Sequence, residues 1–332
     1  MTANLRLAIA GASSLRGKEV AAVVEDRMPA AEVLLFDEQV AEGVLTEAGG
    51  EPAIIQGIDP DSFDGVHFAF FAGSPEFTQR HWKQALQSGA TVIDMSGALR
   101  REASAVPWIP ALRGKLAPPR PATGKLFHSP SPPAIIACTL AAALKDEGVE
   151  RLAVVFFQPV SERGQGGIEE LERQAVNLLS LKPIAQELYG GQVAFNLLGG
   201  YGAEGKETLA GVRAEIAASV TAYLDGRVPT PAIQLVQAPV FHGYCFTAIA
   251  EFAGGCAAEG LERALTDVGI QVMAAGGEPP SNVSVAGESQ IIVAQADPDA
   301  ACAKSCWIWG AADNLRLAAA NAVSIAETLR AS

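Results

Sequence analysis

The sequence is poor in the residues that build disulfide frameworks and metal centres. Its 332 residues include five cysteines, an odd number without a paired C-x-x-C spacing, and four scattered histidines. Disulfide frameworks and zinc sites both depend on such side chains at close and regular spacings. We therefore expect neither a disulfide framework nor a metal site.

Clusters of positive charge are also missing. The chain has 24 lysines and arginines against 37 aspartates and glutamates, which gives a net charge of -13, and it contains no basic run. A nucleic-acid groove needs clustered positive charge to bind phosphates. We therefore exclude nucleic acid as a partner.

Long hydrophobic runs are absent as well. No uncharged apolar stretch reaches the roughly 18 residues that could cross a bilayer. Residues 1–20 lack the basic start and the long apolar core of a signal peptide. We expect a cytoplasmic protein without a membrane partner.

The sequence does contain the alternating strand and helix patterns of a doubly wound α/β fold. The stretch "LRLAIAGASSLRGKEVAAVV" near the start indicates a strand, a tight turn and the beginning of a helix. Similar strand patterns follow at "EVLLFD", "VHFAFFAG" and "TVIDMSG", with a helical pattern at "PEFTQRHWKQALQSG". Residues 1–128 are therefore predicted to form a Rossmann-like domain that binds NAD(P).

A proline-rich passage, "LRGKLAPPRPATGKLFHSPSPP", marks a domain border. The strand and helix patterns after it suit an α+β domain around a largely antiparallel sheet. We predict this second domain over residues 129–310 and expect the helical segment 311–332 to complete the first domain. The predicted fold class is α/β, with a Rossmann-like domain followed by an α+β domain.

The first turn between strand and helix has the outline of a phosphate-binding loop. Its two ends are glycines, but Ser14 stands where a middle glycine would let the backbone approach a pyrophosphate. The candidate cofactor-binding residues of the loop are Gly11, Ser13, Ser14 and Gly17. A tight turn without a ligand stays open as an alternative, because glycine patterns alone are weak signals.

The second strand ends in Asp37-Glu38. A carboxylate at this place can bond a ribose hydroxyl but would repel a 2′-phosphate. NAD therefore fits better than NADP, and binding of either dinucleotide is expected to be weak.

Several motifs, in this order, resemble those of the aspartate-semialdehyde dehydrogenase family. They are the opening turn, "VIDMSGALR" at 92–100, "FFQPVSERGQGG" at 156–167, "QAPVFHGYCF" at 237–246 and "WGAADNLRLAAANAVSIAETL" at 309–329. The resemblance runs nearly end to end and implies the family fold, a homodimer formed through the second domain, and reduction of an aspartyl phosphate by NADPH through a cysteine thioester.

The resemblance also implies that two catalytic groups are replaced. The family's nucleophilic cysteine stands in an Asn-Pro-Asn-Cys segment, and the matching residue here is Pro132. The family's proton-moving histidine is matched by Tyr244, and a clamp arginine by Gln237. Cys138 could serve as a displaced nucleophile, but it lies within an apolar helical run. Apolar surroundings raise the pKa of a thiol, so we favour a role in the core.

Other family positions are retained. Gln158 matches an active-site glutamine, Arg100 an arginine that can meet a phosphate or carboxylate, and Asn314 the segment that returns to the nicotinamide. They imply a site for a small anionic ligand, although a surface salt bridge would also explain Arg100.

Two interpretations follow. In the first, the chain is a degenerate paralogue that lacks phosphorylating dehydrogenase activity and has a binding or partner role. In the second, it is an active NAD(P)-dependent semialdehyde dehydrogenase of amino-acid biosynthesis with altered catalytic residues. We favour the first, because a thiol enzyme without its thiol has no covalent intermediate to reduce.

Overall fold

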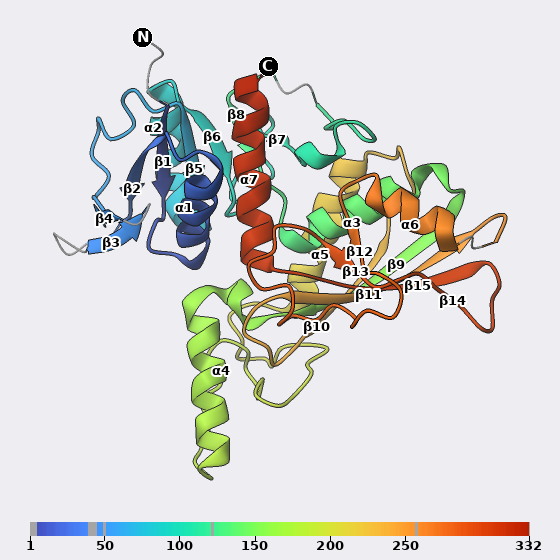
Figure 1. Ribbon diagram of the computed structural model, residues 1–332. Coiled ribbons are helices and arrows are strands. Elements are labelled where there is room, and N and C mark those ends of the chain that lie inside the picture. The colour runs from blue at the N-terminus through green and yellow to red at the C-terminus, as the bar shows by residue number, and fades with distance from the viewer. Residues whose placement is uncertain (1–4, 39–44, 49–50, 121–122, 256–257, 332) are drawn as a thin grey trace. The chain divides into compact units, whose positions relative to one another are not determined.

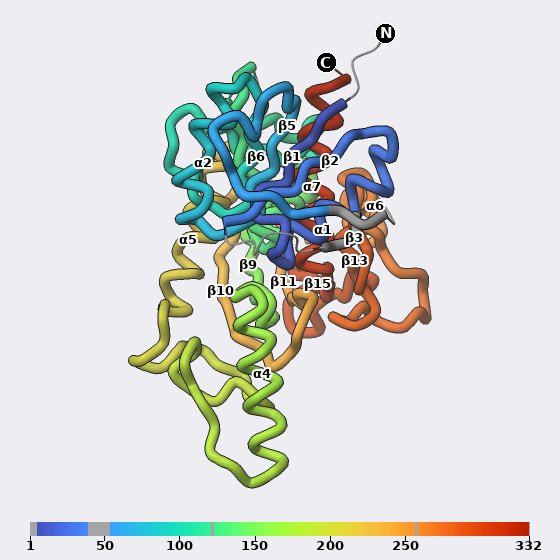
Figure 2. Tube along the Cα trace, turned by 90° about the vertical axis from the view of Figure 1, so that its left-hand side faces the viewer, coloured from blue at the N-terminus to red at the C-terminus, as the bar shows by residue number. Residues whose placement is uncertain are grey.

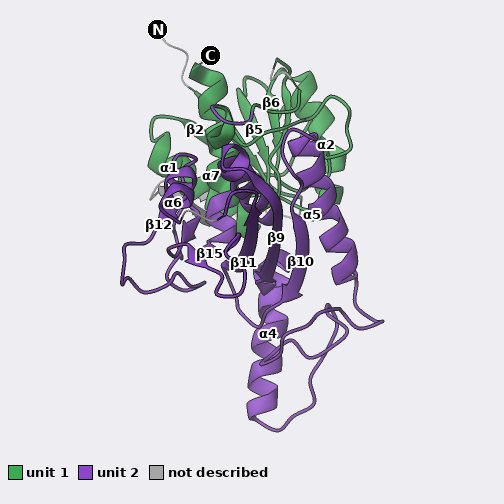
Figure 3. Ribbon diagram, turned by 90° about the vertical axis from the view of Figure 1, so that its right-hand side faces the viewer, with its two compact units in different colours: residues 1–113, 117–131, 318–332 green, residues 114–116, 132–317 purple. Residues whose placement is uncertain are grey.

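The computed structural model describes residues 5–38, 45–48, 51–120, 123–255 and 258–331. The chain divides into two compact units (Figure 3). Unit 1 comprises residues 1–113, 117–131 and 318–332, and unit 2 comprises residues 114–116 and 132–317.

Unit 1 is built on a six-stranded parallel sheet with the strand order β2-β1-β5-β6-β8-β7 (Figure 1). Its strands are β1 (Arg6–Ala10), β2 (Glu32–Phe36), β5 (Phe68–Phe71), β6 (Thr91–Asp94), β7 (Val106–Pro107) and β8 (Leu126–His128). A separate ribbon pairs β3 (Leu45–Ala48) with β4 (Glu51–Ile54). The strand order reverses beside β1, which is where open parallel sheets bind ligands.

Helices cover both faces of this sheet. They are α1 (Leu15–Arg27), α2 (Pro75–Gln87) and, from Ala318 onward, α7 (Asn314–Ala331). Alternate residues of β1 enter two separate apolar cores, Leu7 and Ile9 on one face and Ala8 and Ala10 on the other. The apolar run of β1 therefore follows from burial on both sides.

Unit 2 contains a mixed sheet with the order β10-β9-β11-β15-β13-β12, and β14 pairs with β15. Its strands are β9 (Val149–Gln158), β10 (Ala232–Gln237), β11 (Tyr244–Phe252), β12 (Gln271–Val272), β13 (Ile292–Val293), β14 (Asp297–Pro298) and β15 (Ser305–Ala312). Its helices are α3 (Pro132–Ala143), α4 (Gly164–Leu179), α5 (Leu209–Leu224) and α6 (Ala258–Thr266). The prediction of a parallel first sheet followed by an α+β domain is confirmed.

One face of the unit 2 sheet is buried and the other is open. Along β11 the exposure alternates, so that Phe246 and Ala248 are buried while Thr247 and Ile249 are only partly covered. Figure 1 shows α3, α5 and α6 grouped on one side of this sheet. We call the opposite side the open face.

Helix α4 extends away from the sheet of unit 2 and carries the following segment, 180–208, along its length (Figure 2). The buried Gln174 side chain joins the two, since it donates to Ala185 O at 2.8 Å and accepts from Val193 N at 2.8 Å. We call α4 together with residues 180–208 the arm.

One cysteine forms a disulfide bond, although the sequence predicts no disulfide framework. Cys306, buried on β15, is disulfide-bonded, whereas Cys138, Cys245 and Cys302 are free. Cys256 lies outside the described residues. The absence of a C-x-x-C spacing could not exclude this bond, because folding pairs cysteines that are distant in the sequence.

Among the residues that the structure describes, no helix is long and apolar enough to span a membrane. No group of three or more metal-binding side chains occurs among the same residues.

Candidate functional site

The loop between β1 and α1 is a tight turn that only glycine permits at its two ends. Gly11 has a φ of +89°, and a Cβ there would lie 2.3 Å from the backbone nitrogen of Gly73. A Cβ on Gly17 would lie 2.2 Å from Gly11 O. These two glycines allow the close approach of strand and helix.

Ser14 caps α1 from within this loop. Its hydroxyl accepts a hydrogen bond from Gly17 N at 2.9 Å and donates to Ala72 O at 3.0 Å. The cap satisfies one of the free N–H groups that would otherwise point toward an anion at the helix start. The loop thus offers a phosphate one donor fewer than an uncapped helix would.

Asp37 is engaged by the same loop. Its Oδ2 accepts from Ser13 N at 3.0 Å and also from the Ser13 hydroxyl, while its Oδ1 accepts from Glu38 N at 2.8 Å. Glu38 forms an ion pair with Arg80. The carboxylate that could bind a ribose is therefore bonded to the protein's own loop.

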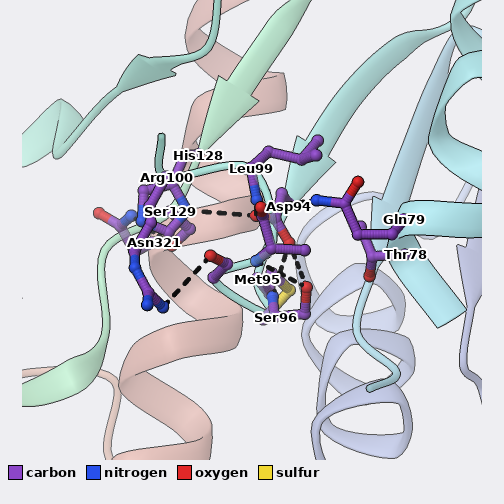
Figure 4. Close-up of polar contacts among 12 residues, drawn as sticks. Thr78, Gln79, Asp94, Met95, Ser96, Leu99, Arg100, His128, Ser129 and Asn321 are labelled. Carbon is purple, nitrogen blue, oxygen red and sulfur yellow. Dashed lines mark hydrogen bonds and ion pairs between the residues drawn. The ribbon is translucent and has the colours of Figure 1, made fainter. Parts of the chain in front are cut away.

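A buried carboxylate lies at the carboxyl end of β6 (Figure 4). Asp94 Oδ1 accepts from Ser96 N at 2.8 Å and Ser96 Oγ at 2.6 Å, and Oδ2 accepts from Leu99 N at 2.8 Å. His128 Nδ1 lies 3.5 Å from Oδ2, from the neighbouring strand β8. Sequence reasoning missed this pair, although both residues end adjacent parallel strands.

These neighbours set the charge of Asp94. Burial raises its pKa, but the nearby imidazole of His128 and the hydrogen bonds from Ser96 and Leu99 lower it by a larger amount, so that the pKa lies below its ordinary value. Asp94 is therefore a carboxylate at neutral pH, and it holds the 95–100 turn against the sheet.

Arg100 lies on this turn, half-buried, with its Nη1 3.5 Å from Gly97 O. It lines a groove of about 550 Å³ together with Arg80, Arg101 and the start of α2. Arg16 Nη1 donates to Met95 O at 3.3 Å on the same turn. The predicted anion-binding arginine thus lies in a groove of mixed charge, in which Arg80 is paired with Glu38 and Glu76 adds a further carboxylate.

In unit 2, Pro132 is the first residue of α3 and is buried. Proline suits this position because the N–H that it lacks would have no partner inside the helix. Cys138 lies further along the same helix and is fully buried, and this burial raises the pKa of its thiol. A neutral thiol in the core is a poor nucleophile.

Four side chains form a closed polar network at the ends of β9, β10 and β11. Gln158 Nε2 donates to Tyr201 Oη at 3.0 Å and to Gln237 Oε1 at 3.1 Å. Tyr201 Oη donates to Gln237 Oε1 at 2.8 Å, and Tyr244 Oη donates to Gln158 Oε1 at 3.3 Å. Gln237 Nε2 donates to Ala238 O at 3.0 Å. The four side chains are themselves neutral, and the guanidinium carbon of Arg163 lies 5.1 Å from the Tyr201 ring.

Asn314 is held at both ends of its amide. Its Oδ1 accepts from Gly243 N at 2.9 Å, while its Nδ2 donates to Glu162 Oε1 at 2.7 Å and to Ser161 Oγ at 3.1 Å. Its donor and acceptor groups are thus engaged within unit 2. The sequence had predicted that this residue contacts the nicotinamide.

Family models cover most of the chain. The model described as the semialdehyde dehydrogenase NAD binding domain matches residues 6–117, and the model described as the semialdehyde dehydrogenase dimerisation domain matches residues 140–317. The chain belongs to the semialdehyde dehydrogenase family. The family predicted from the sequence is confirmed.

Individual members of the semialdehyde dehydrogenase family match end to end. A USG-1 protein homolog of Pseudomonas aeruginosa is 31% identical over 340 residues, which cover 99% of this chain and 98% of the relative. Aspartate-semialdehyde dehydrogenase 2 of Vibrio cholerae is 26% identical, with the same coverage of both chains. The solved structure of a probable aspartate-semialdehyde dehydrogenase from Pseudomonas aeruginosa has a TM-score of 0.84 at 28% identity and covers 98% of each chain.

Within the dimerisation domain of this family member, the open face is largely apolar. Thr247 and Ile249 of β11 lie between β9 and β15, with Trp307 and Trp309 opposite them on β15. Trp307 is 39% exposed, and both tryptophans line a groove of about 480 Å³ beside Thr247. Exposed apolar faces of this kind mark protein interfaces.

The predicted site residues fall into two groups. Gly11, Ser13, Ser14, Gly17 and Arg100 lie in unit 1, and Pro132, Gln158, Tyr244 and Asn314 lie in unit 2. The structure brings Gln158 and Tyr244 into one network. Sequence reasoning missed Tyr201 and Glu162, because nothing in the sequence around them predicts their partners.

Proposed function

We propose that this family member is a degenerate paralogue that lacks phosphorylating dehydrogenase activity and has a binding or partner role. The observation that carries the proposal is Pro132 at the start of α3, because proline has no side chain that could form a thioester. Cys138 does not replace it, since burial keeps its thiol neutral.

The position of the family histidine supports the same proposal. Tyr244 is buried there and its hydroxyl donates to Gln158. A phenol has an ordinary pKa near 10 and is a poor proton acceptor at pH 7. Gln237, at the position of the clamp arginine, offers a neutral amide that the network already uses.

Dinucleotide binding is proposed to be weak, with NAD preferred over NADP. The Gly17 N–H donates to the Ser14 hydroxyl and the Ser13 N–H donates to Asp37, so neither donor is free for a phosphate. The carboxylate of Asp37 would also repel a 2′-phosphate. The proposed cofactor contacts are the loop residues Gly11, Ser13, Ser14 and Gly17, together with Asn314, and no metal takes part.

The proposed organisation follows the family. Residues 1–128 with the helix at 311–332 form the NAD(P)-binding domain, and residues 129–310 form the dimerisation and substrate domain. We propose that two copies pair through the open face as a homodimer in the cytoplasm, and that each copy binds a small anionic ligand.

The first test is an activity assay. Purified chain incubated with aspartate semialdehyde, phosphate and NADP should reduce no NADP above background, because Pro132 cannot hold the acyl group as a thioester. Aspartate-semialdehyde dehydrogenase 2 of Vibrio cholerae serves as the positive control. Turnover near an ordinary enzyme value of about 10 per second would overturn the proposal and support the active alternative.

The second test measures cofactor affinity by calorimetry. We expect a Kd for NAD of about 1 mM or weaker and no measurable heat with NADP. Asp37→Ala removes the repulsion and frees the Ser13 donors, so NADP should bind at least about fivefold more tightly to this variant. Asp59→Ala, at an exposed position, is the control and should change neither affinity. Tight NADP binding by the unaltered chain would contradict the proposal.

A further inference from the structure

Arg163, beside the first turn of α4, has one edge of its guanidinium group without acceptors. Its Nη1 forms an ion pair with Glu207 Oε1 at 2.7 Å, and the side chain is 12% exposed. Its Nε and Nη2 are buried, and neither has a hydrogen-bond partner among the described residues. Buried donors without acceptors are rare, because each has given up its bonds to water. A partner for this edge is therefore expected.

A second buried donor without a partner lies close by. The hydroxyl of Tyr189 has no hydrogen-bond partner in the described chain, and the side chain is fully buried. A Cβ added at Gly167 would lie 2.8 Å from Arg163 Cβ and 2.9 Å from Tyr189 Oη. The charge of Arg163 also reaches Tyr189, where it partly offsets the rise in pKa that burial causes. The two side chains are therefore neighbours beside the start of α4.

Tyr201 holds the guanidinium group in position. The guanidinium carbon of Arg163 lies 5.1 Å from the centre of the Tyr201 ring, and that ring packs edge-on against Tyr189 at 5.3 Å. Cation-π contact at this distance is attractive and orients the guanidinium plane. The hydroxyl of Tyr201 also bonds Gln237, so the charge of Arg163 is one side chain away from the position where the family has an arginine.

The free edge has the geometry of a carboxylate receptor. Nε and Nη2 lie on the same side of a guanidinium group and donate two parallel bonds to the two oxygens of a carboxylate. Glu207 already offsets part of the charge at Nη1, so a monoanion suits the site better than a dianion. The hydroxyl of Tyr189 can supply a third bond.

We propose that Arg163 and Tyr189 bind the carboxylate group of a small organic acid. This site deepens the binding role proposed above and rests on it, because it gives the anionic ligand a chemical class and names the residues that hold it. Arg163 supplies the guanidinium group that Gln237 cannot supply.

Calorimetric titration of the full-length chain with acetate, propionate and inorganic phosphate tests the site. The two carboxylates should bind, and phosphate should bind more weakly. Arg163→Gln should weaken carboxylate binding by about 30-fold, and Arg163→Lys by about tenfold because an ammonium group lacks the two-donor edge. Tyr189→Phe should weaken it by about fivefold.

Arg173→Gln is the matched control. Arg173 lies on α4, its side chain is 48% exposed, and its replacement removes the same charge from the chain. It should leave the affinity for carboxylates unchanged. If Arg163→Gln fails to fold, Arg163→Lys and Tyr189→Phe decide the test.

Three results would overturn the site: no heat with either carboxylate, equal affinity in the Arg163 variants and the unaltered chain, or tighter binding of phosphate. The second result would mean that water alone meets these donors. The activity assay separates this inference from the proposed function, since turnover would overturn the degenerate assignment and leave carboxylate binding at Arg163 intact.

Discussion

Asp94→Ala should lower the free energy of unfolding by about 3 to 5 kcal/mol, because it leaves several buried donors without an acceptor. The carboxylate accepts three hydrogen bonds from Ser96 and Leu99 and lies beside His128, with no exposed surface of its own. Urea denaturation followed by circular dichroism measures the change. Asp64→Ala, at an exposed position of unit 1, is the control and should change stability by less than about 0.5 kcal/mol.

The stabilising effect of Asp94 should depend on pH. The folded pKa of Asp94 lies below its ordinary value of 3.8, so the carboxylate stabilises the fold above about pH 4. This contribution is lost as the pH falls below 3.8 and through the lower folded pKa. The stability difference between the unaltered chain and Asp94→Ala should therefore be full at pH 6 and shrink below pH 4. A difference independent of pH would show that the carboxylate's charge does not matter.

Ile249→Arg should convert the proposed homodimer into monomers. Ile249 lies on β11 near the middle of the open face, with Ala153 on one side and Trp307 on the other. The symmetric interface would then bury two unpaired guanidinium groups, which would weaken the free energy of association by several kcal/mol. A loss of this size is enough to dissociate the dimer at micromolar concentration. Analytical ultracentrifugation should report about twice 34.4 kDa for the unaltered chain and 34.4 kDa for the variant.

Ile54→Arg provides the matching control for this test. Ile54 is 55% exposed in unit 1, so the same substitution there should leave the dimer intact. A monomeric unaltered chain would contradict the proposed homodimer. A dimeric Ile249→Arg variant would mean that the copies pair through another surface.

The elements of the fold could be predicted from the sequence because their signals are local. The run at β1 is apolar on both sides of the strand, and Ser14 and Ser74 precede α1 and α2 as caps. Such patterns depend on neighbouring residues alone. The order of these elements then limits the topology to a parallel sheet followed by a mixed one.

The polar contacts of the candidate site could not be predicted in the same way. Tyr201 bonds Gln237, and Asn314 bonds Glu162, across 36 and 152 residues of sequence. Arg163 gave no signal either, because a single arginine before a glycine-rich helix start is common on protein surfaces. Only the packing of the arm shows that one edge of its guanidinium group is buried.

The placement of α7 affects the order in which the protein can fold during synthesis. Its residues Ala319, Ala322, Val323 and Ile325 fill one of the two apolar cores of unit 1, beside strands from the beginning of the chain. A ribosome releases the N-terminal sheet long before it makes this helix. The core of unit 1 therefore stays incomplete until nearly the whole chain has been translated, and the apolar surface that α7 covers in the folded protein is exposed until then.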